Sequence, residues 1–177
     1  MAAAVVTQPH NLLLLVTAET CRGSTYTVTG ANTSLGLEAA RHLVRLGSAT
    51  VIMAVRDPAF GLRALADIES PTGISGVAKD LMKIKDEPIV ESNAEDMTQK
   101  AYPLSKFLKI MAIRHLTGLL PLQRTGVVIN LMCPGLSKQK KRYGRTAEDG
   151  SRTLLYGAAA GEDSHGCLLK PCTIAEM

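Results

Sequence analysis

Short apolar runs and stretches of helical periodicity alternate along the first half of the chain. Residues 24–30 (STYTVTG) indicate a short strand that runs into a glycine turn. Residues 49–55 (ATVIMAV) form a continuous apolar run rich in β-branched side chains, which is typical of a strand buried on both faces of a sheet. Between these strands, residues 34–46 repeat apolar side chains at helical spacing, and Gly47 marks the end of that helix.

A second helix is predicted to follow Pro58. The side chains expected to face the core are Leu35, Ala39, Leu43 and Leu46 in the first helix and Phe60, Leu62, Leu65 and Ile68 in the second. Strand, glycine turn, helix, strand and helix in this order predict a right-handed βαβ unit, and therefore an α/β fold.

The hydrophobic pattern is weaker after Pro71. Residues 76–82 are compatible with a short strand, and the polar, aperiodic residues 83–100 are interpreted as a loop. Helical periodicity returns at residues 103–120, where Pro103 fits the first turn because its missing N–H costs nothing there. One face of this helix carries Leu104, Phe107, Leu108, Met111 and His115.

Two further elements follow in the second half. Residues 126–132 (GVVINLM) are its best predicted strand, and residues 146–161 predict a helix that opens with Thr and closes with Gly. No internal repeat or clear linker interrupts the chain. We therefore expect a single domain over residues 1–177, with residues 1–23 as an N-terminal extension.

The composition is that of a soluble globular protein. Apolar residues make up 46% of the 177 residues and charged residues 20%, while aromatic residues make up only 3% and there is no Trp. The core must therefore consist of aliphatic side chains and Met. The apolar run 12–16 is far too short to span a bilayer, which takes about 20 residues, and no basic segment precedes it as in a signal peptide. We expect a cytoplasmic protein without a membrane span.

The net charge of +4 comes largely from one basic run, KQKKRYGR, at residues 138–145. A run of this kind is most often a solvated loop, and a phosphate-facing or nucleic-acid role is the alternative. Overall we expect no nucleic-acid partner. The four cysteines, Cys21, Cys133, Cys167 and Cys172, match no zinc-binding spacing and are interpreted as reduced thiols, with no metal site.

The turn TGANTSLG at residues 29–36 leaves a strand and enters a helix, which is where glycines let the backbone approach a pyrophosphate. Gly30 and Gly36 fit this role, whereas Ser34 occupies the position between them that would suit another glycine. Arg56 follows the second strand, twenty residues after Gly36. An arginine there suits the 2′-phosphate of NADP(H), where an acidic residue would suit NAD(H). A surface arginine at a strand end is the alternative interpretation.

These residues carry a family resemblance. The segment TYTVTGANTSLGLEAARHLV resembles the Thr-Gly-x-x-x-Gly-x-Gly segment of the short-chain dehydrogenase/reductase family, and YPLSK resembles its Tyr-x-x-x-Lys motif. VVINLMCPGL resembles the sixth strand of the family with its Pro-Gly loop, KDLM resembles the end of its third strand, and GSRTLLYGAAAGEDSHG resembles the penultimate helix of fungal, retinol-dehydrogenase-like members. The segments cover about two thirds of the chain in the order of the family.

The resemblance implies a Rossmann-type doubly wound parallel sheet and an NADP(H)-dependent oxidoreductase that interconverts a carbonyl and a secondary alcohol on a small organic substrate. Tyr102 would donate the proton, while Lys106 would lower the Tyr102 pKa and hold the nicotinamide ribose. The residues implied at the cofactor are Gly30, Ser34, Leu35, Gly36, Arg56, Asp80, Tyr102 and Lys106, with Asp80 at the end of the third strand against the adenine. The fungal branch suggests a tailoring step in secondary metabolism, and a homo-oligomer is one possible state.

The chain also departs from the family. About twenty residues separate Asp80 from Tyr102, too few for the family's fourth strand with its Asn-Asn-Ala-Gly segment, the following helix, and the fifth strand with its catalytic serine. The segment after Pro134 and Gly135 is also short compared with the family, and the sequence ends at residues 172–177 (CTIAEM). Without the two strands, either two sheet edges stay open or the first and sixth strands pair directly. A catalytically impaired nucleotide-binding remnant, or a gene model that skips coding segments, is therefore the alternative function.

Overall fold

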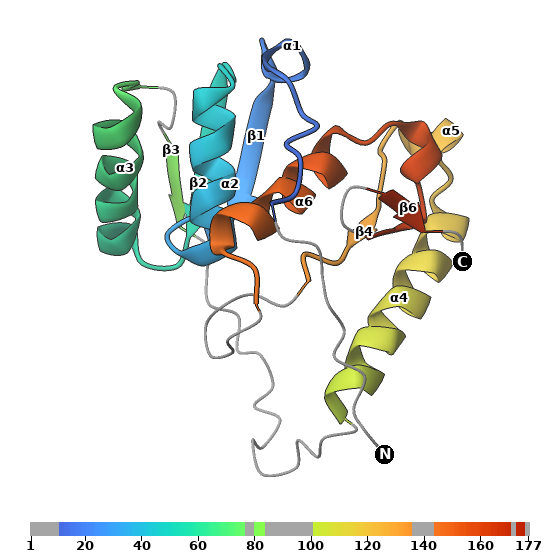
Figure 1. The fold of residues 1–177 in the computed structure, drawn as a ribbon. Helices are drawn as coiled ribbons and strands as arrows, with labels where there is room; N and C mark the ends of the chain where they lie inside the picture. Colours follow the sequence, from blue (N-terminus) through green and yellow to red (C-terminus); the bar gives the residue numbers. More distant parts are fainter. Residues whose placement is uncertain (1–10, 77–79, 84–100, 136–143, 171–172, 176–177) are drawn as a thin grey trace.

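The structure, a computed structural model, describes residues 11–76, 80–83, 101–135, 144–170 and 173–175. Two separate three-stranded sheets organise these residues (Figure 1). The first contains β1 (Thr25–Thr29), β2 (Thr50–Val55) and β3 (Asp80–Lys83), all parallel and paired in that order. The second contains β4 (Leu131–Met132), β5 (Leu168–Lys170) and β6 (Thr173–Ala175). The α/β fold is confirmed, and the two sheets do not join.

Two helices accompany the first sheet. Helix α2 (Ser34–Arg45) links β1 to β2, and α3 (Pro58–Thr72) links β2 to β3. Helix α3 begins after Asp57, whose carboxylate accepts a hydrogen bond from the N–H of Ala59 at 2.8 Å. It ends at Gly73, whose φ of 65° is the left-handed conformation that favours glycine at a helix end. The βαβ unit predicted from residues 24–72 is therefore present, with α3 capped at both ends.

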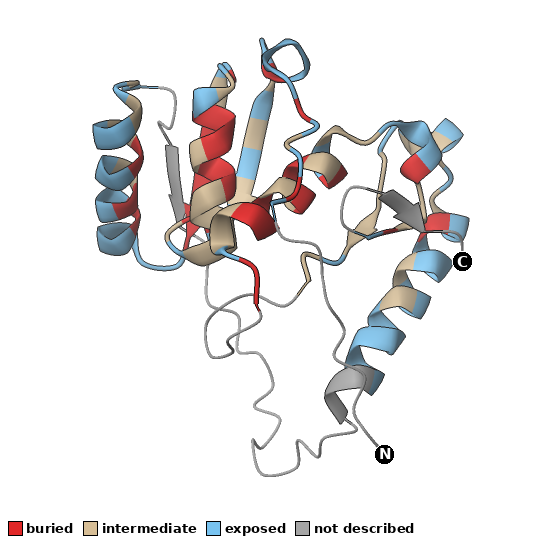
Figure 2. Cartoon of the chain, viewed as in Figure 1, coloured by how far each residue is buried: buried red, intermediate tan, exposed pale blue. Residues whose placement is uncertain are grey.

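The core lies between the first sheet and these helices (Figure 2). Its buried side chains include Ala40, Leu43 and Val44 from α2, Val51 and Met53 from β2, and Ala64 and Ile68 from α3. The predicted inward face of α3 is wrong at two positions, since Phe60 and Leu62 are 53% and 59% exposed. The small residues Gly61 and Ala64 are buried on this helix in their place.

The N-terminal segment is part of this core. Leu12, Val16 and Cys21 are buried, and residues Ala18–Cys21 form the single turn α1. Arg152 in the C-terminal half donates a hydrogen bond to the backbone carbonyl of Leu12. The described part of the predicted extension, residues 11–23, therefore packs against the domain.

Helix α6 (Ala147–Ala159) connects the two halves of the molecule by packing against α2. Thr146 caps it, accepting a hydrogen bond from the N–H of Asp149 at 3.0 Å. At the contact, Nε2 of His42 lies 3.0 Å from a carboxylate oxygen of Glu148, which Arg152 also binds. Burial lowers the pKa of His42 below its usual value, and the negative charge of Glu148 opposes that shift without cancelling it.

Helix α4 (Ala101–Leu119) lies beside the second sheet, followed by the short helix α5 (Leu122–Thr125). The predicted helix is confirmed, but its apolar face is uncovered: the exposed side chains are Leu104, Phe107, Leu108, Met111 and His115. Thr117 is buried near the C-terminal end of α4, where it adjoins Gly166. Among the described side chains of α4, the remainder are exposed or half-buried, so this helix contributes little to a core.

The strand predicted at residues 126–132 is much shorter in the structure, where only Leu131–Met132 form β4. Its pairing lies on one side alone, with the N–H of Leu131 and Cys133 bound to carbonyls of residues 167 and 169. Its neighbour β5 has only three residues, so the ladder between the two strands ends after Leu131 and Met132. We expected that the missing strands would either leave two sheet edges open or bring β1 and β4 together. In the described residues β1 and β4 do not pair, and both lie at the edges of their sheets.

The basic run 138–145 falls mostly outside the described residues. Arg145 is described and is 1% exposed, with a hydrogen bond to the carbonyl of Pro134 at 3.0 Å. For this residue the prediction of a solvated loop is wrong, because its guanidinium anchors the start of α6 to the segment after β4. No helix in the described parts of the chain is both long and apolar enough to cross a membrane.

Candidate nucleotide-binding groove

The glycine turn after β1 is tied to the end of β2. Gly30 has φ of 65°, a conformation that a residue with a side chain adopts at a cost, and its N–H donates to the carbonyl of Ala54 at 2.9 Å. The turn therefore leaves β1 at the carboxyl edge of the sheet. This is the edge where ligands bind in open parallel sheets.

Gly36 is required by the close approach of α2 to this turn. A Cβ atom on Gly36 would lie 2.4 Å from the carbonyl oxygen of Gly30, and neither backbone could move far without breaking the turn. The missing side chain thus lets α2 start directly beside Gly30. Thr33, at the N-cap, makes no side-chain hydrogen bond to the helix, so the first N–H groups of α2 are not capped by this residue.

Ser34 stands where a glycine would fit better. Its φ of 52° lies in the left-handed region, which costs an L-residue about 1–2 kcal/mol. The neighbouring Leu35 points toward α6, where a Cβ on Gly150 would lie 2.6 Å from its side chain. Leu35 therefore helps to pack α2 against α6, and its implied place at the cofactor stays a prediction.

A groove of about 770 Å³ opens at this edge, within the range of small-molecule sites. It is lined by Gly30, Asn32, Thr33, Ala54, Arg56, Asp57 and Phe60. The structure thus brings two of the expected residues, Gly30 and Arg56, into one site. Within the described parts of the chain, Arg56 is exposed and forms no ion pair. The neighbouring carboxylate of Asp57 caps α3 by accepting a hydrogen bond from the N–H of Ala59.

Sequence reasoning missed five of the lining residues: Asn32, Thr33, Ala54, Asp57 and Phe60. Asn32 and Thr33 lie inside the turn motif, so their position between the glycines was a usable signal. Asp57 precedes Pro58, a typical helix start, and this could have placed its carboxylate in a cap. For Phe60 the signal was ambiguous, because the helical spacing assigned it to the core.

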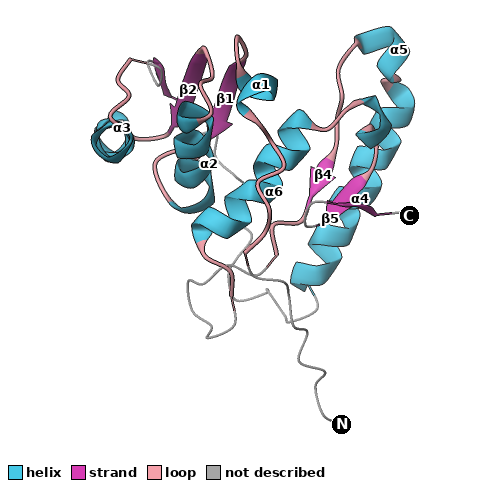
Figure 3. Ribbon diagram, turned by 45° about the horizontal axis from the view of Figure 1, so that its top comes forward, coloured by secondary structure: helices cyan, strands magenta, loops and turns pink. Residues whose placement is uncertain are grey.

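The proposed catalytic pair lies on α4, away from this groove. Tyr102 and Lys106 are both in the helix, four residues apart, so they share a side of it. The side chain of Tyr102 is outside the described residues. Lys106 is exposed and is not among the residues lining the groove, and Figures 1 and 3 show α4 beside the second sheet, apart from β1 and β2.

Asp80 was expected at the end of the third strand, but it is the first residue of β3. It pairs with Ile52 and lies three residues before Lys83, where the strand ends. This correction follows from the register: β3 continues past Asp80 as far as the end of β2. Its side chain is also outside the described residues. A contact of Asp80 with the adenine therefore stays a prediction.

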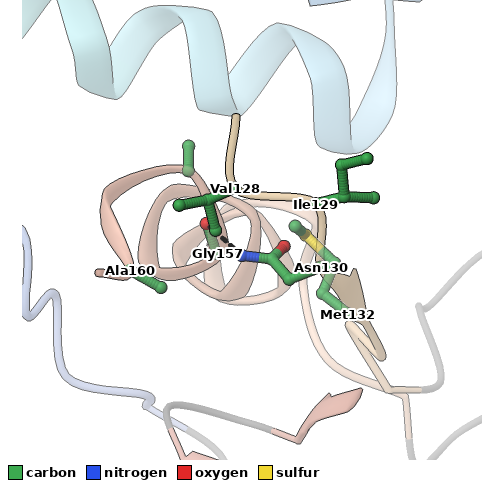
Figure 4. A pocket seen from close by; sticks show the side chains of 7 residues that line it. Val128, Ile129, Asn130, Met132, Gly157 and Ala160 are labelled. Atoms are coloured by element: carbon green, nitrogen blue, oxygen red, sulfur yellow. Dashed lines mark hydrogen bonds between the residues drawn. The ribbon is translucent and has the colours of Figure 1, made fainter. Parts of the chain in front are cut away.

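A smaller pocket of about 330 Å³ lies between the segment before β4 and the end of α6 (Figure 4). Its lining residues are Val128, Ile129, Asn130, Met132, Gly157, Ala158 and Ala160. The Asn130 amide donates to the carbonyl of Gly157 at 2.9 Å and to Ser164 at 3.0 Å, so it serves to hold the segment in place. None of these residues can exchange a proton near neutral pH, and among the described residues no cluster could hold a metal ion. The groove beside Gly30 is therefore the candidate site.

Fungal proteins are similar to parts of this chain. Short chain dehydrogenase atnD from Emericella nidulans is 60% identical over 52 residues, which are 29% of this chain and 17% of that protein. Short chain dehydrogenase/reductase dmxR8 from Cryptosporiopsis sp. is 33% identical over 98 residues, 48% of this chain and 30% of that protein. The chain thus spans less than a third of the length of these curated relatives. No protein-family model matches it.

Solved structures show the same fold. A short chain dehydrogenase from Shigella flexneri superimposes with a TM-score of 0.64 at 15% identity, over 90% of this chain and 96% of that chain. A short-chain type dehydrogenase/reductase from Mycobacterium ulcerans gives 0.62 at 15% identity, over 84% and 88%. These matches, with the parallel first sheet and its glycine turn, define a reduced Rossmann-type fold. Parts of the chain are thus similar in sequence to fungal short-chain dehydrogenases/reductases, and its fold resembles that of solved short-chain dehydrogenases.

Proposed function

We propose that this protein binds NADP(H) and acts as an oxidoreductase on a carbonyl or secondary alcohol. The observation that carries the proposal is the position of Arg56 in the groove beside the glycine turn. A guanidinium matches the charge and geometry of a 2′-phosphate. The adjacent carboxylate of Asp57, which could otherwise bind the ribose hydroxyls of NAD(H), already accepts the N–H of Ala59.

The groove fits a dinucleotide at its phosphate end. Gly30 and Gly36 leave no side chain between the turn and α2, so backbone N–H groups at the start of α2 can face a pyrophosphate. The positive charge of Arg56 would hold the 2′-phosphate. When bound, the cofactor supplies or accepts the hydride of the reaction.

Tyr102 and Lys106 are proposed to handle the proton. A phenol has a pKa of about 10, so near pH 7 it needs a neighbouring positive charge to become an effective acid or base. Lys106, one helical turn further along α4, would supply that charge. The Tyr102 hydroxyl would then donate its proton to the carbonyl oxygen of the substrate. We further propose that the substrate is a small organic molecule and that the protein is cytoplasmic. Its reaction would be a tailoring step in fungal secondary metabolism.

Titration of the purified protein with NADPH and NADH, followed by the fluorescence of the reduced nicotinamide, tests the cofactor. We expect NADPH to bind at least about tenfold tighter than NADH, a difference of about 1.4 kcal/mol. Arg56→Asp should narrow or invert the ratio. Arg124→Asp, the same charge change on the exposed side of α5, is the matched control and should leave the ratio unchanged. Equal affinities in the starting protein would remove Arg56 from the site.

A second candidate function is nucleotide binding without turnover. The observation that favours it is the separation of α4 from the groove, since Lys106 lies on a helix beside the second sheet. Genomic DNA between the codons for Asp80 and Tyr102 distinguishes the two. An intact coding segment for the strand, helix and serine would favour an active full-length enzyme.

A further inference from the structure

One large apolar side chain in the groove is exposed rather than packed into the core. Phe60 lies in the first turn of α3, is 53% exposed, and lines the groove together with Arg56 and Gly30. The chain has only two Phe residues and no Trp, so aromatic surface is scarce. An exposed aromatic ring inside a candidate ligand site suggests contact with a ligand that has an apolar face.

The ring of Phe60 is also held in place. The guanidinium carbon of Arg63, one turn further along α3, lies 5.4 Å from the centre of the ring, a cation–π contact. Arg63 is not among the described residues that line the groove, so it contacts the ring from outside. A ring fixed in this way offers a flat surface at a low entropic cost, which suits the stacking of a planar base.

We propose that Phe60 is the stacking surface for the adenine base of the nucleotide, which makes it a binding and positioning residue of the groove. The inference rests on the proposed binding of NADP(H). Arg56 and Phe60 lie four residues apart and line the same groove, so a 2′-phosphate on Arg56 would bring the adenine of the same nucleotide toward α3. Base–aromatic stacking typically contributes enough to be measured by alanine substitution.

The neighbouring Leu62 supplies a matched control. It is 59% exposed on the same helix, yet it does not line the groove. If Phe60 were an ordinary exposed apolar residue, both residues would respond alike to truncation. We expect Phe60→Ala to weaken the binding of 2′,5′-ADP, measured by calorimetry, about tenfold or more, and Leu62→Ala to change it less than about twofold.

A tryptophan reporter tests the contact directly. The chain has no Trp, so the variant Phe60→Trp contains a single tryptophan. We expect 2′,5′-ADP to quench the fluorescence of this tryptophan because the adenine stacks on it. Phe107→Trp, at the similarly exposed other phenylalanine on α4 (56%), should show no quenching. Because 2′,5′-ADP lacks nicotinamide, this signal is independent of catalysis and of energy transfer to NADPH.

The outcomes separate the two proposals. If the unchanged protein binds 2′,5′-ADP but Phe60→Ala binds it within about twofold, or if the tryptophan at position 60 is not quenched, the stacking role is wrong while NADP(H) binding stands. If the unchanged protein binds neither NADPH nor 2′,5′-ADP, the proposed function is wrong and the stacking role is lost with it. Should Phe60→Ala fail to fold, the Phe60→Trp measurement decides the question.

Discussion

The two sheets of this molecule differ in how completely they are built. The first has three parallel strands, two helices, and a core that contains Met53 and Ile68 at 1% and 0% exposure. The second has strands of two or three residues, and its helix α4 leaves Leu104, Phe107 and Leu108 each 56% exposed. Both come from one chain with an ordinary apolar content.

The difference shows which parts of the fold are self-sufficient. A βαβ unit with a following helix contains all the neighbours that its strands and helices need, so it closes a core from consecutive residues. In the described structure, β4 and α4 lack the strands and helix that would lie between them and β1. The proposed nucleotide binding would depend on the first region, and the proposed proton transfer on the second. We therefore expect the two to respond separately to change.

The largest effect is expected on turnover. We predict that this chain reduces carbonyl substrates poorly even while it binds NADPH. One positioned hydrogen-bond donor at a reacting oxygen is worth about 10²–10³-fold in rate, and misplacement of the catalytic pair adds to the loss. Inserting the strand–helix–strand segment of a fungal relative between Asp80 and Tyr102 should raise NADPH-dependent reduction by at least this factor, measured as NADPH oxidation.

In the extended protein, Tyr102→Phe should then abolish the reaction. Robust reduction by the unmodified chain, lost on Tyr102→Phe, would show that the second region is complete enough for catalysis. Activity that survives Tyr102→Phe would remove this tyrosine from the mechanism.

The next effect concerns stability. Ile68→Ala removes a fully buried side chain between α3 and the first sheet, and should lower the free energy of unfolding by about 2–5 kcal/mol. Leu108→Ala makes a similar change on the exposed face of α4 and should cost less than about 0.5 kcal/mol. Urea unfolding of both variants measures the difference. Equal losses would mean that the α4 face is covered in solution.

A smaller gain is expected at the glycine turn. Ser34→Gly relieves a left-handed backbone at φ 52°, and should raise the free energy of unfolding by about 0.5–1 kcal/mol while opening the approach to the phosphates. Thr33→Gly is the control, because its φ of −160° is extended backbone that any residue adopts. Weaker NADPH binding by Ser34→Gly would indicate that the serine hydroxyl donates to a phosphate.

The smallest effect is a pH dependence at the contact of α2 with α6. The folded protein binds a proton on His42 more weakly than the unfolded chain, whose histidine pKa is about 6.5. The unfolded state therefore takes up more protons, and stability should decline as the pH falls below about 6.5. Glu148 and Glu38 favour the charged imidazole, while Arg152 and Arg45 oppose it. Urea unfolding at several pH values between about 7.5 and about 5.5 measures this decline. The free energy of unfolding of His42→Gln should depend less on pH than that of the unchanged protein.

Local patterns predicted the first region closely. The helix expected at residues 34–46 is α2, Ser34–Arg45, and the strand expected at 49–55 is β2, Thr50–Val55, because apolar periodicity and glycine stops are properties of consecutive residues. The same patterns placed Gly30 and Arg56 in one site. They failed at Phe60, since periodicity cannot distinguish a side chain that faces a core from one that faces a groove.

The second region could not be predicted in the same way. The run 126–132 is apolar enough for a long strand, but strand length depends on neighbours that lie elsewhere in the fold, and only Leu131–Met132 pair. The side of α4 that carries Phe107 and Met111 is also apolar enough to be buried, but no element of the described structure covers it. Sequence patterns report what a residue can pack against. They do not report whether a partner is present.

The hydrogen bond from Arg152 to the carbonyl of Leu12 joins residues 140 positions apart. Such a contact closes a loop of 140 residues, and the packing of α2 against α6 reduces the entropy that this closure costs. During synthesis, the first sheet with α2 and α3 can assemble while α6 is still unmade, because its residues are close in sequence. The carbonyl of Leu12 can accept this hydrogen bond only after Arg152 has been made. A segment that precedes the first sheet is therefore fixed by a residue that follows it by most of the domain.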